Sequence, residues 1–145
     1  MIDPDNVPEV HGDEMLARFI LNKKHFRPSD NAVKPVLFLA YKHVGLSVNR
    51  HRDYDESEIW QFGRNVAEFR NKSFHGRSDI PVSACTFDVL AVKAKPIRNH
   101  PDGLPDNPNH ADIVGFPSAK EDQLSFAAKL AAAASDRMEL PAESE

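Results

Sequence analysis

Histidine and aspartate occur together in three short segments of this sequence, two of which also contain arginine, and their side chains could carry out chemistry. The segments are 49–53 (NRHRD), 75–79 (HGRSD) and 107–112 (NPNHAD). An imidazole exchanges protons near neutral pH, and a guanidinium binds carboxylates and phosphates in a fixed geometry. The first two segments could therefore bind an anion and transfer a proton beside it.

The first segment contributes Arg50, His51 and Arg52, which lie between a predicted strand and a predicted helix. The N-terminus of a helix favours anions, because free backbone N–H groups and the helix dipole are positive there. We therefore expect Arg50 and Arg52 to bind an anion such as phosphate, with His51 as a catalytic acid or base. In the alternative, these side chains are solvated and pair with carboxylates of residues 53–56.

The second segment places three polar side chains at alternate positions. In a strand, His75, Arg77 and Asp79 would point to the same face of the sheet. The imidazole could then act as an acid or base, the guanidinium could bind an anion, and the carboxylate could orient them. The alternative is a solvent-facing strand with a bend at Gly76.

The third segment ends in a His-x-Asp pair after a proline turn. Asp112 could fix the tautomer of His110, or both could bind a metal with a third ligand such as His75 or His100. Two ligands on one strand do not make a metal site. Alternatively, Asn109 and Asp112 satisfy the backbone of the turn, and His110 has no role.

Cys85 is the single cysteine, which excludes an internal disulfide. It lies in a predicted strand region, where we expect a buried and unreactive thiol. His75 precedes it by ten residues, and this spacing resembles that of the ubiquitin-conjugating enzymes. The resemblance implies an exposed Cys85 that forms a thioester. The Pro-Asn pair after that family's histidine is replaced here by Gly76 and Arg77, and no helix precedes the first predicted strand.

Local patterns predict the elements that position these segments in the first half of the chain. Alternating apolar residues predict strands at 15–21 and 46–50. The apolar run 36–41 predicts a central strand, paired with 46–50 in a hairpin. A helix opens with a capping-box pattern at Asp55 and continues with apolar residues at helical spacing.

The second half of the chain alternates between weak strand signals and clear helix signals. Two or three short strands are expected between 73 and 95, followed by a proline-rich loop at 96–109 and a strand at 110–114. A Ser-x-x-Glu capping box at Ser118 opens a helix that ends near Ser135. Its alanine-rich apolar face predicts close packing inside the domain or against another chain.

Together these elements predict one α+β domain over residues 14–136. We expect a mixed or mostly antiparallel sheet of about five strands, packed against two helices. The ends of the chain, 1–13 and 137–145, are rich in proline and acidic residues and show no apolar periodicity. They are expected to be loose tails.

Composition narrows the classes of function. Lys and Arg number 18 and Asp and Glu number 22, so the net charge of −4 predicts no strong nucleic-acid binding. The longest apolar run is far shorter than the ~20 residues of a membrane span, and the N-terminal residues lack the pattern of a signal peptide. With a single cysteine, these features predict a cytoplasmic protein that does not cross a membrane.

Several common catalytic and cofactor motifs are absent. The glycines are spread singly, so there is no glycine-rich phosphate loop, and no H-E-x-x-H, C-x-x-C or G-x-S-x-G pattern occurs. We therefore expect no cofactor and no resident metal.

Two classes of function follow from these observations. The first is a non-catalytic binding or accessory protein that contacts another protein or a second copy of itself. The alternative is a small hydrolase or transferase acting on a phosphorylated or nucleotide-like ligand. Its arginines would hold the anion and its histidines would transfer protons. His51, His75 or His110 would serve as the proton-transfer group, and a single site could use all three only if they meet in one pocket.

Overall fold

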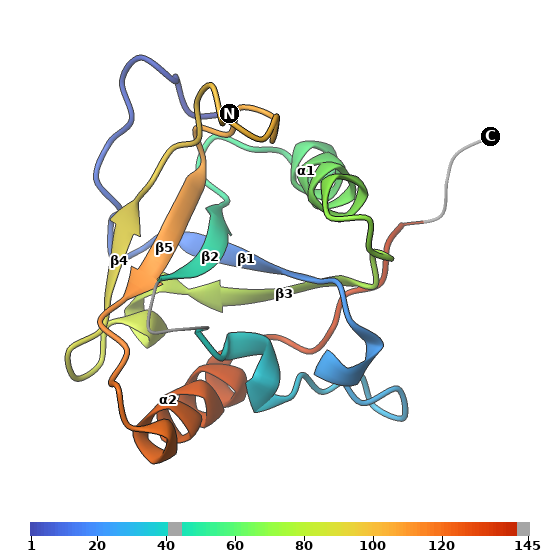
Figure 1. Cartoon of the computed structure of the whole chain (residues 1–145), viewed down its shortest axis with the longest axis vertical. Coiled ribbons are helices and arrows are strands. Elements are labelled where there is room, and N and C mark those ends of the chain that lie inside the picture. Colours follow the sequence, from blue (N-terminus) through green and yellow to red (C-terminus); the bar gives the residue numbers. More distant parts are fainter. Residues whose placement is uncertain (41–44, 142–145) are drawn as a thin grey trace.

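The computed structural model describes residues 1–40 and 45–141, and it shows one five-stranded sheet between two α-helices (Figure 1). The strands are β1 (Met15–Ile20), β2 (Leu46–Arg50), β3 (Gly76–Pro81), β4 (Ala91–Ala94) and β5 (His110–Val114). The helices are α1 (Glu56–Phe69) and α2 (Lys120–Ala133). Neighbouring strands are antiparallel, in the order β3-β1-β2-β5-β4. The predicted α+β class is confirmed.

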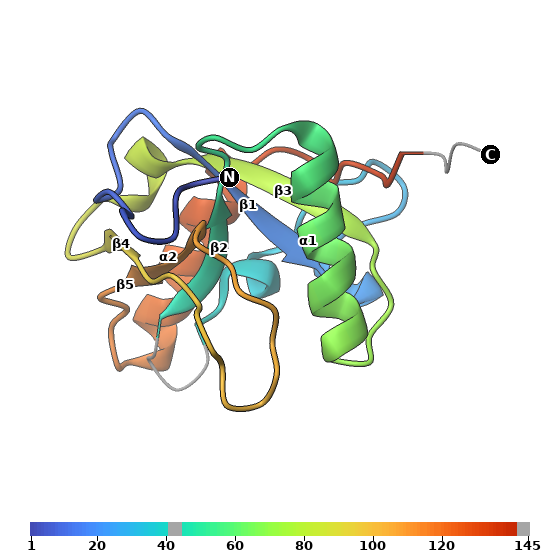
Figure 2. The same ribbon diagram turned by 90° about the horizontal axis from the view of Figure 1, so that it is seen from above.

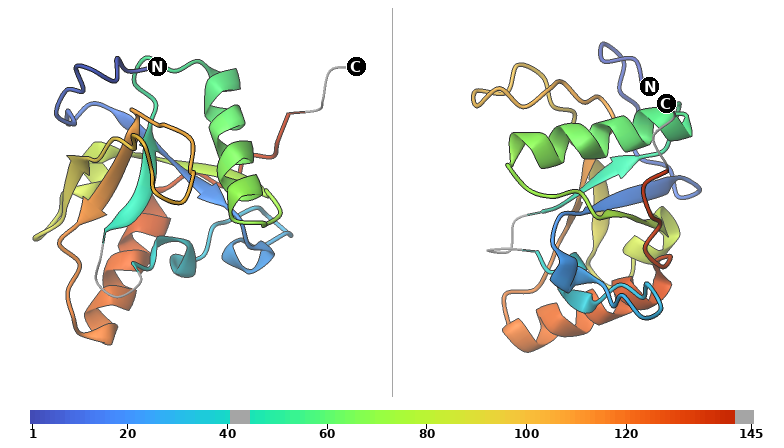
Figure 3. Two further views of the ribbon diagram at one scale, coloured as in Figure 1. Left: turned by 45° about the horizontal axis from the view of Figure 1, so that its top comes forward. Right: turned by 90° about the vertical axis from the view of Figure 1, so that its right-hand side faces the viewer.

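Each face of the sheet is covered by one helix (Figures 1 and 3). On β1, Leu16 and Ile20 belong to the larger hydrophobic core, which also contains the buried side chains of α2. The alternate residues Ala17 and Phe19 belong to a smaller cluster with Ile59 of α1. Side chains of successive strand residues point to opposite faces, so the period-two pattern of the sequence accounts for this division.

The apolar run expected as a central strand is instead a 3-10 helix at Pro35–Phe38. Pro35 begins this helix, and Leu37 and Phe38 are buried in the same core as α2. A run that is buried on all sides fits either a strand or a helical turn, so its apolar character did not decide between them. The expected hairpin is not formed by the described residues, because β2 pairs with β1 and β5. Tyr41 lies outside the described residues.

The two helices begin differently. Asp55 caps α1 in a complete capping box, accepting a hydrogen bond from the Glu58 amide, as predicted. The capping box predicted at Ser118 is not formed, because α2 begins at Lys120 with Ala119 as its N-cap. The Gln123 side chain instead donates to the main-chain carbonyls of the preceding turn, at residues 117 and 118.

The described residues near both ends of the chain are packed where loose tails were expected. Ile2 is buried, and its amide donates to the Asn109 side chain at 2.9 Å. Near the other end, Met138 forms an antiparallel bridge with Arg77 on the edge strand β3. Gly76 lies beside it with φ of 122°, and a Cβ there would collide with the Met138 carbonyl. Long-range contacts, which have no local sequence signal, thus hold both segments: a bond to a side chain at Ile2 and a backbone bridge at Met138.

The proline-rich residues 96–109 form the predicted loop, which extends from the β4–β5 end of the sheet toward α1 (Figure 2). The loop is closed at its base by an antiparallel bridge between Ile97 and Asn107. His100 makes an edge-on ring contact with Phe69 at the end of α1. The loop therefore spans the space between the sheet and the helix.

Candidate functional site

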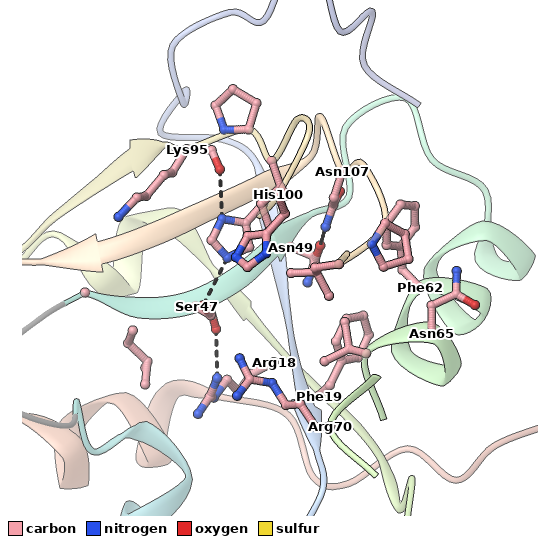
Figure 4. A pocket seen from close by; sticks show the side chains of 18 of the residues that line it. Arg18, Phe19, Ser47, Asn49, Phe62, Asn65, Arg70, Lys95, His100 and Asn107 are labelled. Carbon is pink, nitrogen blue, oxygen red and sulfur yellow. Dashed lines mark hydrogen bonds between the residues drawn. The ribbon is translucent and has the colours of Figure 1, made fainter. Parts of the chain in front are cut away.

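A cleft of about 690 Å³ lies between the loop 96–109, helix α1 and the face of the sheet that α1 covers (Figure 4). Its apolar wall includes Phe19, Leu21, Phe62, Val66, Ile97 and Leu104. Its basic side chains are Arg18, Arg70, Lys95 and Arg98, with His25, His100 and His110. No Asp or Glu occurs among the described residues that line it. The cleft thus joins an apolar wall to a concentrated positive charge.

Among the described residues, the hydrogen-bond partners of the Arg18 guanidinium are neutral carbonyls. Its guanidinium donates to the carbonyl of Leu37 at 3.0 Å and to the carbonyl of Ser47 at 2.9 Å. Burial and the nearby charge of Arg70 lower the pKa of Arg18 to about 10. The side chain therefore remains a cation at neutral pH and lies close to a second guanidinium.

Arg70 directly follows α1 and points toward Arg18 in the cleft (Figure 4). Two other basic residues of the cleft have acidic partners: Lys95 pairs with Asp112 at 3.2 Å, and Arg98 pairs with Asp5 at 2.9 Å. Within the described part of the chain, neither Arg18 nor Arg70 forms such an ion pair. The two guanidiniums leave an uncompensated positive charge in the wall.

A serine and a histidine form a hydrogen-bonded pair in the same cleft. The Oγ of Ser47 on β2 lies 3.0 Å from Nε2 of His110 on β5. Nδ1 of His110 lies 2.8 Å from the Lys95 carbonyl, which can only accept a hydrogen bond. Nδ1 therefore carries the proton in the neutral imidazole, and Nε2 accepts a hydrogen bond from the Ser47 hydroxyl.

The surroundings of His110 favour its neutral form. Burial lowers the pKa of His110 below its ordinary value of 6.5, and the charges of Lys95 and Arg70 act in the same direction. The Lys95 carbonyl and the charge of Asp112 oppose this change only in part. Asp112 approaches Nε2 at 3.8 Å, so the carbonyl, and not the expected carboxylate, fixes the tautomer.

The predicted anion-binding residue Arg50 does not line the cleft, and its guanidinium is occupied by protein groups. Its guanidinium makes two hydrogen bonds to the Glu14 carboxylate, at 2.7 and 2.8 Å. It also donates to the carbonyls of Pro8 and Glu9. Arg52 lies 3.7 Å from the same Glu14 carboxylate. This geometry favours a structural role for Arg50, holding the N-terminal segment.

His51, Arg77 and Asp79 come together beside the start of α1, outside the cleft. His51 Nε2 and the Arg77 guanidinium share one oxygen of Asp79, each at 3.1 Å. Arg77 also donates to Glu56 at 2.9 Å and stacks over the Trp60 ring. The guanidinium is buried between two carboxylates and an aromatic ring, so its donors largely face protein groups. One of its nitrogens, Nη1, is buried and has no hydrogen-bond partner.

His75 does not join either group. Its ring packs beside Phe26, and its main-chain carbonyl accepts a hydrogen bond from Arg137. The three histidines of the sequence clusters thus occupy separate surroundings, and only His110 lines the cleft. The described residues contain no group of three metal-ligating side chains that could hold an ion.

Cys85 is fully buried, with its thiol near the Pro81 carbonyl. Burial raises the pKa of this thiol to about 12, so the reactive thiolate is suppressed at neutral pH. This argues against the conjugating-enzyme hypothesis, which requires an exposed thiol. In the described part of the chain, neither helix combines the length and apolar character that crossing a membrane requires.

No protein-family model matches this chain, and comparison with the curated proteins and with solved structures finds no significant match. A function for the cleft must therefore be inferred from the geometry of its residues.

The sequence clusters missed most of the cleft. Arg18 interrupts the apolar pattern of the first strand, and this charged residue among apolar ones is the one sequence signal for its role in the cleft. The only sequence signal for Ser47 is that it lies between two inward-facing apolar residues of a strand, Leu46 and Val48. Arg70 and Lys95 carry no local signal, because their significance depends on contacts between distant segments.

Proposed function

We propose that this protein binds a small anionic molecule with an apolar portion in the cleft between α1, the sheet and the loop 96–109. The proposal narrows the phosphorylated or nucleotide-like ligand class expected from the sequence, and it moves the anion site from Arg50 and Arg77 to Arg18 and Arg70. One observation carries it: the guanidiniums of Arg18 and Arg70 lie near each other in the cleft, and its described lining residues include no carboxylate (Figure 4).

The electrostatics of the cleft support an anionic ligand. Removing a cation from water costs free energy that a nearby opposite charge offsets, and two like charges repel each other as well. In the described part of the chain Arg18 has only carbonyl partners, and Arg70 contributes to the lowered pKa of Arg18. A phosphate or carboxylate between the two guanidiniums would remove both costs and accept charge-assisted hydrogen bonds.

The size and lining of the cleft support a small molecule. Its volume of about 690 Å³ falls within the range of small-molecule sites, roughly 300–1,000 Å³. Phe62 and Phe19 supply aromatic surface in the same cleft, and the Asn49 and Asn107 side chains, linked by a hydrogen bond, supply polar contacts. The lining therefore fits a ligand with an apolar or ring-shaped part and one anionic group.

Calorimetric titration tests this proposal with matched probes. Phenyl phosphate and adenosine monophosphate should bind, whereas phenol and adenosine, which lack the charge, should bind at least about tenfold more weakly. Added salt should weaken the binding of the anions.

A pair of helix variants locates the binding. Arg70→Gln should weaken phenyl phosphate binding about fivefold, equivalent to about 1 kcal/mol for an exposed charged contact. Arg64→Gln removes the same charge from the same helix outside the cleft and should leave the affinity unchanged. Equal affinity for charged and neutral probes, or equal effects of the two variants, would contradict the proposal.

The accessory-protein hypothesis stays a prediction with less support. The alanine-rich helix α2 buries Phe126, Ala127 and Leu130 inside the domain. The exposed large apolar side chains come from separate segments of the chain: Met1, Met15, Val36, Phe69, Val89 and Leu124. A cytoplasmic location also stays a proposal, which the free and buried Cys85 supports.

A further inference from the structure

The serine–histidine pair in the cleft has the arrangement of an activated nucleophile. Ser47 Oγ lies 3.0 Å from His110 Nε2, and the Lys95 carbonyl orients the imidazole from its other nitrogen. Nucleophile, base and orienting group in hydrogen-bond contact are the parts required for covalent acyl transfer. We propose that Ser47 and His110 hydrolyse a carboxylic ester whose anionic group is held by Arg18 and Arg70. The inference rests on the proposed function, because the cleft must first bind the anion.

The reaction is balanced without any further reactant except water. Ser47 Oγ attacks the ester carbonyl carbon while its proton moves to His110 Nε2, so that an oxygen–carbon bond forms. The bond to the alcohol then breaks, and the alcohol leaves with the proton from His110. Water repeats the attack on the acyl-serine with His110 as the base, which releases a carboxylic acid and restores Ser47.

Neighbouring charges suit this sequence of steps. His110 faces Ser47 from β2, Asp112 from its own strand, Lys95 from the end of β4, and Arg70 from the end of α1. Burial and the two cations favour the neutral imidazole that must accept the proton. Asp112, at 3.8 Å from Nε2, favours the imidazolium that forms during attack.

Arg18 places positive charge beside the nucleophile. Its guanidinium donates to the main-chain carbonyl of Ser47 itself at 2.9 Å (Figure 4). Attack on the ester carbonyl creates a negative oxygen next to Oγ, and a fixed cation nearby stabilises that charge. One of the cations that would hold the ligand thus contacts the main chain of the residue that carries the reacting hydroxyl.

Diisopropyl fluorophosphate tests the nucleophile directly. The serine oxygen displaces fluoride from phosphorus, and the adduct is located by mass spectrometry of the peptides. We expect the adduct on Ser47, formation slowed by phenyl phosphate, and a labelling rate that levels off above the lowered pKa of His110. His110→Gln should slow labelling about 100-fold. Ser29, in an exposed loop, should stay unlabelled, and Ser29→Ala should label like the wild type.

Hydrolysis tests the substrate class. The mono-4-nitrophenyl ester of succinic acid, which is anionic, should be cleaved faster than 4-nitrophenyl acetate, and Ser47→Ala should abolish the difference. Ser47→Ala should retain phenyl phosphate binding in the calorimeter, which shows that it is folded. An unlabelled Ser47, or cleavage that persists in Ser47→Ala, would overturn the inference. If phenyl phosphate still binds in that case, the proposed anion site stands and only the catalytic pair fails.

Discussion

The buried ion pair between Arg50 and Glu14 offers a stringent test of how this structure is held together. Its side chains are 0% and 7% exposed, and the carboxylate receives two hydrogen bonds from the guanidinium. The same guanidinium holds the carbonyls of Pro8 and Glu9, so it links strand β2 to the N-terminal segment. Glu14→Gln removes the charge and leaves the cation buried without an acidic partner in hydrogen-bond contact.

The expected loss of stability is large. Removing one partner of a buried ion pair costs about 3–5 kcal/mol, and an amide can still accept one hydrogen bond, so we expect about 3 kcal/mol. For a chain of this size, that free energy lowers the melting temperature by about 10 °C. Asp13→Asn makes the same change in charge at a neighbouring carboxylate that is 83% exposed, and it should cost well under about 1 kcal/mol.

Urea unfolding followed by Trp60 fluorescence gives the loss of unfolding free energy in both variants. The slope of that free energy against urea concentration checks two-state behaviour. Limited proteolysis of residues 1–13 should be faster in Glu14→Gln, because the N-terminal segment loses its anchor. A loss below about 1 kcal/mol, equal to that of Asp13→Asn, would refute the assignment of Arg50 to a structural ion pair.

Acid should narrow the difference in the free energy of unfolding between the wild type and Glu14→Gln. Burial raises the pKa of Glu14, but hydrogen bonds from Arg50 and the His11 amide, with the charges of Arg50 and Arg52, bring it below 4.5. The unfolded state therefore takes up this proton first as the pH falls. The stabilisation is present above pH 4.5 and is lost as the pH falls through the folded-state pKa, and Glu14→Gln lacks this loss.

Three further predictions address single features. In an NMR titration, the imidazole of His110 should take up its proton below pH 6.5. The wild type should lose stability as the pH falls below that value, and His110→Gln should remove part of this loss. An ordinary titration near pH 6.5 would contradict the buried environment of His110. Native Cys85 should not react with Ellman's reagent until the protein unfolds; rapid reaction would show it to be exposed. Asp55→Ala should cost about 1 kcal/mol through the lost cap of α1, whereas Ser118→Ala should cost nothing measurable; equal losses would contradict the different helix starts.

Local patterns predicted the elements that local interactions determine. The Asp55 capping box and the apolar spacing after it predicted α1, and alternation predicted β1 and β2. The run at 36–40 was misassigned because a segment buried on all sides carries no period that separates a strand from a helical turn. The capping box predicted at Ser118 was wrong because the pattern forms only when the helix starts directly after that residue, and α2 starts at Lys120.

The site was harder to predict because its parts meet through tertiary contacts. His110 was identified by its residue type, but its partner Ser47 lies 63 positions away in the sequence. Arg50 was assigned to an anion because the partner that occupies it, Glu14, lies 36 positions away. Arg18 and Arg70 approach each other only when α1 folds across the sheet. Residue chemistry was therefore predictable, whereas the pairing of charges was not.

The central claim is that an anion binds at Arg18 and Arg70 in the cleft. Chemical-shift mapping with ¹⁵N-labelled protein and phenyl phosphate tests it most directly, because each perturbed amide reports its location. We predict saturable shifts at Ser47, Ile97 and Arg70, with a weaker response in Arg70→Gln. An absence of shifts, or shifts gathered around His51 and Arg52 instead, would contradict the claim.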